Sequence, residues 1–345
     1  MSRTGPRALL HDLVATPSVS DDEEAAAARL VDYFAAHDRE VFVDDVGNVH
    51  APGDDAVLLT SHIDTVPGDI PVRIEDDVLW GRGAVDAKGP LCAMAVAAVE
   101  TGVSFVGVVG EERDSRGARH LLDTRREPAA LVNGEPSGWD AVTLGYRGLL
   151  AGTYVATSPS GHASRPEPNA IEEAIRWWGR LETAFSTDQW ATITERVTPK
   201  PLRFSGGLTD DGVAVEASVD TQFRVPFDTD IDTVRDAVEA QLDVDGSVES
   251  SVTWKDAIPP VLVDRRGPLP AAFRRAIRTN GGEPRLLVKT GTSDMNLYAE
   301  VWDCPMVTYG PGDSDLDHAP DERIDLVEYD RAISILVDVC ETFVG

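Results

Sequence analysis

The stretch Leu58-Leu-Thr-Ser-His62-Ile-Asp64 gives the first indication of the fold, because an apolar run ends in side chains that can bind a metal ion. Alternate residues of a β-strand point to the same face, so His62 and Asp64 are expected to face the same way. Strand ends hold functional side chains rigidly and leave them accessible to a substrate. The stretch therefore predicts a buried strand that presents a site at its carboxyl end.

Similar combinations of an apolar run or a glycine-rich turn with a carboxylate or an imidazole recur along the chain. The residues concerned are Asp86, Glu111, Glu112, Glu135 and His318. Together with His62 they supply two imidazoles, a carboxylate that can bridge, and further carboxylates. Such a set suits two neighbouring zinc-like ions and leaves a position for water. The motifs therefore predict a metal-dependent hydrolase.

The adjacent carboxylates Glu111 and Glu112 follow an apolar run, where burial is costly unless cations or solvent meet them. One of them can bind a metal ion while the other takes a proton from the attacking water. Asp64 can accept a hydrogen bond from the second ring nitrogen of His62 and so fix its tautomer. The alternatives are a solvated acidic loop, an ordinary strand-end histidine and, for Asp86, a helix N-cap.

Strands and helices alternate up to about residue 145, which predicts an α/β fold in which a mixed central sheet carries helices on both faces. The expected strands are residues 41–43, 57–60, 72–74, 103–109 and 130–132, and the expected helices are 7–15, 22–37, 88–100 and 116–125. The alternation of strands and helices returns after Pro259-Pro260. Helices are expected at 268–280 and 326–343, and strands at 286–288 and 306–309.

The pattern between these two parts is different, because apolar and polar residues alternate over 149–157 and 213–225 as in half-exposed antiparallel strands. Helical patterns occur at 170–185 and 230–242. We therefore expect a smaller α+β domain, residues 146–255, inserted into a catalytic domain made of residues 1–145 and 256–345.

The charge balance is strongly acidic, with 60 acids against 31 bases and a formal net charge of −29. Such a chain repels itself at low ionic strength, and about 1 M salt shortens the Debye length to about 3 Å. We therefore expect adaptation to a salt-rich cytosol. An acidic surface made for a basic partner is the alternative, which is weaker because the acids are spread along the whole chain. Nucleic-acid binding is disfavoured on the same grounds.

No apolar run reaches the roughly 18–20 residues of a membrane helix, and the first residues lack an apolar signal core. We therefore expect a cytosolic protein without a membrane partner. The cysteines Cys92, Cys304 and Cys340 are few and widely spaced, so neither a structural disulfide nor a cysteine metal site is expected.

The metal-site motifs resemble, in order and spacing, those of the dinuclear zinc amidohydrolases that include acetylornithine deacetylase, succinyl-diaminopimelate desuccinylase, aminoacylase and carboxypeptidase G. The resemblance covers essentially the whole chain, and it implies that Glu111 is the general base and that Asp64 orients His62. It also implies two divalent ions, zinc or alternatively cobalt or manganese. One ion would be held by His62, Asp86 and Glu135, and the other by Asp86, Glu112 and His318.

The inserted domain resembles the lid and dimerisation domain of that family. Ser160-Gly-His162-Ala-Ser is similar to a segment whose histidine reaches across a homodimer to polarise the scissile carbonyl. A loop histidine is the alternative. Asn169 and Arg224 resemble residues that contact the substrate, although Arg224 can also be part of a surface ion pair. Gly291 and Thr292 resemble a loop at the substrate end of the cleft.

Gly-Glu111-Glu112 and the segment 289–296 resemble the branch of this family that releases lysine or ornithine from an acidic amino-group carrier protein in lysine and arginine biosynthesis. Acetylornithine deacetylase, desuccinylase and dipeptidase activities remain alternatives, and a non-catalytic metal-binding protein is a remote one. Candidate residues for the substrate ammonium group are Asp294 and Glu300. A candidate basic patch for the carrier, expected on the helix beside the acidic pair, consists of Arg113, Arg116 and Arg119.

Overall fold

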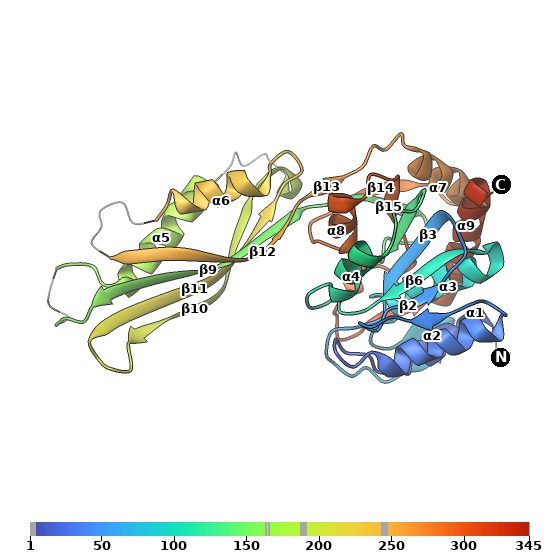
Figure 1. The fold of residues 1–345 in the computed structure, drawn as a ribbon, viewed down its shortest axis with the longest axis horizontal. Coiled ribbons are helices and arrows are strands. Elements are labelled where there is room, and N and C mark those ends of the chain that lie inside the picture. The colour runs from blue at the N-terminus through green and yellow to red at the C-terminus, as the bar shows by residue number, and fades with distance from the viewer. Residues whose placement is uncertain (1–4, 163, 165, 187–191, 243–247, 345) are drawn as a thin grey trace. The chain divides into compact units, whose positions relative to one another are not determined.

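The computed structural model describes residues 5–162, 164, 166–186, 192–242 and 248–344, and the chain divides into two compact units (Figure 1). Unit 1 comprises Met1–Gly145, Val263–Val288 and Ser293–Gly345. Unit 2 comprises Tyr146–Leu262 and Lys289–Thr292. The second unit thus extends beyond residue 255, and β12 (Glu249–Ile258) lies wholly within it.

The sheet of unit 1 follows the order β1-β2-β6-β3-β7-β15-β8, with β14 beside β8. Its centre is parallel, because β3 pairs in parallel with both β6 and β7, and β15 pairs in parallel with β7. Antiparallel pairs of β2 with β6 and of β15 with β8 make the sheet mixed. The strands are β1 (Phe42–Val43), β2 (Val49–Ala51), β3 (Asp54–His62), β6 (Val103–Val108), β7 (Leu131–Gly134), β8 (Ala141–Tyr146), β14 (Arg285–Lys289) and β15 (Met306–Thr308).

Helices lie on both sides of these strands, with α3 and α9 on one side and α4 and α8 on the other (Figure 1). This arrangement confirms the predicted fold class. The helices of unit 1 are α1 (Pro6–Val14), α2 (Glu24–Ala36), α3 (Lys88–Thr101), α4 (Arg116–Thr124), α7 (Pro268–Thr279), α8 (Asp294–Val301) and α9 (Leu326–Val344).

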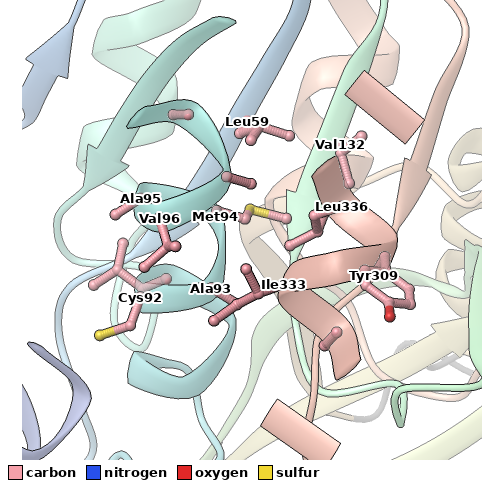
Figure 2. Packing of buried hydrophobic residues seen from close by; sticks show 14 of the residues in the cluster. Leu59, Cys92, Ala93, Met94, Ala95, Val96, Val132, Tyr309, Ile333 and Leu336 are labelled. Atoms are coloured by element: carbon pink, nitrogen blue, oxygen red, sulfur yellow. The ribbon is translucent and has the colours of Figure 1, made fainter. Parts of the chain in front are cut away.

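The core of unit 1 is centred on α3, whose residues from Lys88 to Ala98 are all buried. The prediction of a buried helix there is confirmed. Its alanines and Gly89 leave little side-chain bulk, which lets neighbouring elements approach closely on every side. Helix α9 packs against it and brings larger side chains. Figure 2 shows this contact, formed by Ala93, Met94, Ile333 and Leu336, with Leu59 and Val132 beside it.

A small antiparallel sheet in unit 1 joins two segments that are far apart in the sequence. Its order is β16-β5-β4, formed by β4 (Arg73–Glu75), β5 (Val78–Trp80) and β16 (Arg323–Asp325). Strand β5 leads into the turn that carries Asp86, and the loop that carries His318 leads into β16. The pairing of β5 with β16 therefore brings these two loops to the same place.

Unit 2 contains an antiparallel sheet of order β10-β11-β9-β12, with helices α5 and α6 packed on it. Burial alternates along β11, as the sequence pattern predicts. Tyr154 and Trp177, two large and fully buried side chains, stack with ring centroids 4.1 Å apart. The elements are β9 (Gly148–Pro159), α5 (Ala170–Ala184), β10 (Thr198–Leu208), β11 (Ala214–Val225), α6 (Ile231–Glu239), β12 and β13 (Val261–Leu262).

Among the described helices, none is long and apolar enough to cross a membrane. The thiols of Cys92, Cys304 and Cys340 are free, and two of them, Cys92 and Cys340, are buried.

Replacing Val132 by Ala tests the packing of the central sheet. Val132 is fully buried in β7, between β3 and β15, so the loss of two methyl groups should lower the free energy of unfolding by about 2 kcal/mol. Val327→Ala is the matched control, because Val327 of α9 is 42% exposed. Denaturant unfolding measures both. Equal, small losses for the two variants would contradict the packing described for β7.

Candidate metal and catalytic centre

Three parallel strands bring the candidate residues of unit 1 to one edge of the sheet. Strand β3 ends at His62, β6 ends shortly before Glu111, and β7 ends next to Glu135. The carboxyl ends of adjacent parallel strands open on the same edge, which is the usual place for a site in an α/β sheet. The turn before α3 adds Asp86, and the loop before β16 adds His318.

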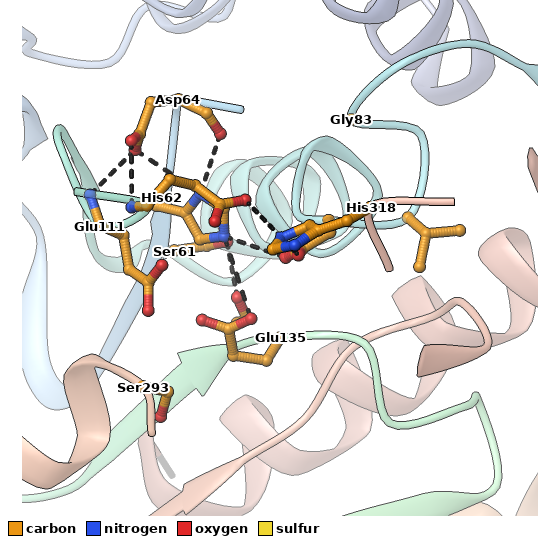
Figure 3. Close-up of polar contacts among 12 residues, drawn as sticks. Ser61, His62, Asp64, Gly83, Glu111, Glu135, Ser293 and His318 are labelled. Carbon is orange, nitrogen blue, oxygen red and sulfur yellow. Dashed lines mark hydrogen bonds and ion pairs between the residues drawn. The ribbon is translucent and has the colours of Figure 1, made fainter. Parts of the chain in front are cut away.

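The carboxylate of Asp86 lies between two imidazoles that come from distant parts of the chain. Its Oδ1 is 3.2 Å from Nε2 of His62, and its Oδ2 is 3.1 Å from Nε2 of His318. Figure 3 shows the side chains of His62 and His318 at this site, with Glu135 beside them. Each oxygen thus faces a different imidazole, as a carboxylate that bridges two cations requires.

The remaining two carboxylates lie one at each end of this arrangement. Oε2 of Glu135 is 3.9 Å from Nε2 of His62, whereas Oε1 of Glu112 is 3.1 Å from Nε2 of His318. Donor atoms of His62, Asp86 and Glu112 also lie within 4.8 Å of one another. Tetrahedral zinc with bonds of 2.0–2.1 Å places its ligand atoms about 3.3 Å apart. The donor set and its spacing therefore fit two divalent ions.

The electrostatics of the cluster also favour added positive charge. Burial alone would lower the pKa of His62, but its contacts with Asp64 and Asp86 outweigh this effect and raise the pKa well above the usual value. Hydrogen bonds to Asp86 and Glu112 raise the pKa of His318 to about 10. The carboxylates thus attract protons to the imidazoles. Cations bound there would satisfy the carboxylates instead and leave the imidazoles neutral, as ligation requires.

Asp64 organises the turn that carries the acidic pair. Its carboxylate is fully buried and accepts hydrogen bonds from the backbone N–H groups of Glu111 (3.1 Å) and Glu112 (3.2 Å). The hydroxyl of Ser20 donates a further bond of 2.7 Å. This carboxylate therefore fixes the backbone from which both glutamates extend.

The contact between Asp64 and His62 differs from the one expected from the sequence. Nδ1 of His62 lies 2.9 Å from the backbone carbonyl oxygen of Asp64 and 3.6 Å from its carboxylate. Because β3 ends at His62, Asp64 lies beyond the strand and does not follow its alternation. The carbonyl oxygen is therefore the nearer group that can orient the ring.

Glu111 follows Gly110, whose φ of +74° lets the chain turn sharply after β6. Burial raises the pKa of Glu111 well above its usual value, and the negative charge of Glu135 raises it further. A carboxylate with a raised pKa is a better proton acceptor, whereas an adjacent cation would keep it ionised at neutral pH. Its environment therefore suits a general base.

The candidate residues of unit 2 fall in separate places within that unit. Nη1 of Arg224 is 3.4 Å from the hydroxyl of Thr292, which follows Gly291. His162 is exposed, and its Nδ1 is 2.8 Å from the hydroxyl of Ser164. The side chain of Asn169 caps α5 by accepting hydrogen bonds from the first turn of that helix. Arg224 and Thr292 thus form one local group to which the other two side chains do not belong.

The basic patch expected from the sequence lies on the predicted helix in part, because Arg116 and Arg119 belong to α4, but two of its arginines are paired with acids. Arg113 lies in the turn before α4 and forms an ion pair with Asp21. Arg116 pairs with Glu23 at 2.8 Å and with Asp21 at 3.2 Å. In so acidic a chain, carboxylates just before α2 pair with these arginines.

The two candidates for the substrate ammonium group differ in burial. Asp294 is 2% exposed at the start of α8, and within the described chain its Oδ1 has no hydrogen-bond partner. Burial raises the pKa of Asp294 to about 7. Glu300 is exposed near the end of the same helix. Asp294 is therefore the better placed of the two.

Two residues that support the site were not found from the sequence. Ser20 has no signal there, because a single serine before acidic residues is common. Glu322 closes the segment Asp-His318-Ala-Pro-Asp-Glu, and its place beside a candidate ligand is a signal that could have been used. Its carboxylate accepts a hydrogen bond from the backbone of Asp86.

Comparison with known proteins agrees with this geometry. Residues 58–342 match the profile described as Peptidase family M20/M25/M40, and the chain belongs to this family. It is thereby a metal-dependent amide hydrolase, and the resemblance noted in the sequence is confirmed.

Two relatives are similar over nearly their whole length. A Deinococcus radiodurans protein named "[LysW]-lysine hydrolase" is 37% identical, covering 98% of this chain and 97% of that protein. A Sulfurisphaera tokodaii protein named "[LysW]-lysine/[LysW]-ornithine hydrolase" is 30% identical, covering 99% and 96%. The crystal structure of aminopeptidase PepT from Bacillus cereus shares the fold, with a TM-score of 0.82, 20% identity and full coverage of both chains.

Replacing Glu111 by Gln should preserve metal binding and reduce kcat by about 10²–10⁴-fold, since the amide has the same shape but cannot accept a proton. Metal content by elemental analysis and single-turnover hydrolysis are the two measurements. Glu100→Gln, at an exposed position of α3, is the control and should keep full activity. An active Glu111→Gln enzyme would remove Glu111 from this role.

Proposed function

We propose that this enzyme releases lysine, ornithine or both from an acidic amino-group carrier protein in amino-acid biosynthesis. The amino acid would be attached through its α-amino group to the γ-carboxyl group of the carrier's C-terminal glutamate. The observation that carries the proposal is the complete donor set with Glu111 beside it, in a chain similar over nearly its full length to relatives named as [LysW]-lysine hydrolases. Lysine biosynthesis is the pathway that fits best, and arginine biosynthesis follows if ornithine is also a substrate.

The chemistry assigned to the chain's residues is a proton transfer. His62, Asp86, Glu135, Glu112 and His318 would hold two ions, for which we propose zinc, with cobalt and manganese compatible with the same donors. Such ions supply Lewis-acid polarisation of the scissile carbonyl and make water more acidic. Glu111 takes a proton from the attacking water as the C–O bond forms, and it returns a proton to the amine as the C–N bond breaks.

Unit 2 is assigned the roles of lid and dimerisation domain. Its edge strand β10 exposes Leu202, Phe204 and Leu208, which are 58%, 44% and 68% exposed. An edge strand with unpaired backbone groups and apolar side chains is suited to pairing with a second copy of the chain. In such a homodimer, His162 of one protomer would stabilise the oxyanion formed in the other.

Recognition of the substrate carboxylate is assigned to Arg224 and Thr292, with Gly291 next to Thr292 in the chain. A separate substrate contact is assigned to Asn169 from its sequence motif. The planar guanidinium can form two parallel hydrogen bonds to a carboxylate. Burial lowers the pKa of the neighbouring Arg147, and the positive charges of Arg224 and Arg196 lower it further, which is consistent with an anion-binding role for this group. Asp294 is the candidate for the ammonium group of the bound lysine or ornithine.

The excess of acids supports function in a salt-rich cytoplasm, where screening reduces repulsion within the enzyme and between the enzyme and an acidic carrier. Assays of this enzyme therefore belong at about 1 M salt or above.

A substrate panel tests the proposed function. Carrier-linked lysine, carrier-linked ornithine, acetylornithine and succinyl-diaminopimelate are offered in parallel at high salt, with the Glu111→Gln enzyme as a blank. We expect kcat/KM for a carrier-linked substrate to exceed that for the free amides by about 100-fold or more, because contacts with the carrier contribute binding energy in the transition state. Turnover of the free amides alone would reject the carrier as substrate.

Replacing Arg224 by Lys tests the carboxylate site. The ammonium group keeps the charge but loses the two-pronged geometry, so KM should rise by about 10-fold with a smaller change in kcat. Arg235→Lys is the matched control, because Arg235 of α6 pairs with Asp232, one turn away on the same helix. Steady-state kinetics measure both variants. An unchanged KM for Arg224→Lys would assign Arg224 to a local structural role.

A further inference from the structure

Glu322 is a fully buried acid in the loop that carries His318, just before β16. No role in proton transfer or metal binding has been assigned to it. A buried carboxylate is costly unless it is well compensated, so its contacts indicate what it does.

The carboxylate of Glu322 accepts hydrogen bonds from the turn that carries Asp86. Its Oε1 accepts hydrogen bonds from the backbone N–H groups of Val85 (2.8 Å) and Asp86 (3.1 Å). Its Oε2 accepts from the backbone N–H of Gly83 (3.1 Å) and from Nη1 of Arg82 (2.8 Å). Each oxygen thus has two donors, and the carboxylate compensates three backbone groups of one turn.

The backbone of the same residue contributes a further link, because the carbonyl oxygen of Glu322 accepts a hydrogen bond of 3.2 Å from the N–H of Gly81. Both ends of the turn before α3 are therefore attached to one residue. His318, in the same loop, has a φ of +59°, which is uncommon for a residue other than glycine. Such a conformation persists only where the surrounding contacts enforce it.

We propose that Glu322 is a positioning residue of the metal centre, which holds the turn of Asp86 against the loop of His318 so that the Asp86 carboxylate faces both imidazoles. The inference rests on the metal centre proposed above and is independent of the identity of the substrate. Glu322 binds the backbone of one candidate ligand and shares a short loop with another. It therefore sets the distance between two donors that come from opposite ends of the sequence.

Glu322→Gln is the decisive variant. A glutamine has one acceptor oxygen, so its NH₂ group must face either the N–H groups of Val85 and Asp86 or those of Gly83 and Arg82. Residues that orient metal ligands from outside the coordination sphere typically contribute 10–100-fold to metal affinity. We expect zinc and cobalt, measured by equilibrium dialysis against the metal-free enzyme, to bind about 10–100-fold more weakly to the variant.

The visible spectrum of the cobalt-loaded protein gives a second measurement that does not depend on activity, because it reports the geometry around the ion. The spectrum of the Glu322→Gln protein should be altered. Glu173→Gln is the matched control. Glu173 is also a buried acid with an arginine partner, Arg180 at 2.6 Å, but it belongs to unit 2. This control is expected to lose stability without any change in metal affinity or spectrum.

Metal affinity of Glu322→Gln within about twofold of wild type, with an unchanged cobalt spectrum, would overturn the proposal. If the glutamine variant does not fold, Glu322→Asp decides instead. It keeps the charge but is shorter by one methylene group, so it cannot reach all three N–H groups, and unchanged metal affinity there would also overturn the proposal. Because wild-type metal binding is measured alongside, failure of the metal centre itself would be recognised separately.

Discussion

The structure of the site depends on one carboxylate, that of Asp86, which faces His62 with one oxygen and His318 with the other. The two imidazoles come from the end of a central strand and from a loop near the end of the chain. They can meet at Asp86 only if the sheet, the N-terminal end of α3 and the β5–β16 pairing are all in place. The parallel centre of the sheet and the buried, alanine-rich α3 therefore position the ligands around Asp86.

The same arrangement explains why so many acids can be buried together. Several carboxylates meet at one edge of the sheet, and their negative charge raises the pKa of His62 and of His318. Divalent cations would remove this conflict. The supporting residues have complementary tasks, since Asp64 fixes the turn of Glu111 and Glu112 while Glu322 fixes the turn of Asp86. Both do so through backbone N–H groups, which leaves the ligand side chains free.

The sequence predicts those parts of the molecule whose signals are local. Helix α3 and strand β6 come from largely apolar runs, and the donors follow recognisable turns. In contrast, β10 contains Pro199 and Pro201 and is exposed on both faces, so no alternation marks it as a strand. The role of Glu322 depends on backbone atoms 236 residues away in the chain. The ion pairs of Arg113 and Arg116 are not visible in the sequence for the same reason, because their partners Asp21 and Glu23 lie just before α2, far away along the chain.

Anomalous diffraction from crystals of the metal-loaded enzyme, recorded on both sides of the zinc absorption edge, tests the central claim most directly. The account predicts two peaks per protomer, about 3.5–4 Å apart, one on each side of the Asp86 carboxylate. The peak on one side should lie beside His62 and Glu135, and the other beside His318 and Glu112. A single peak, or two peaks that do not share Asp86, would contradict it.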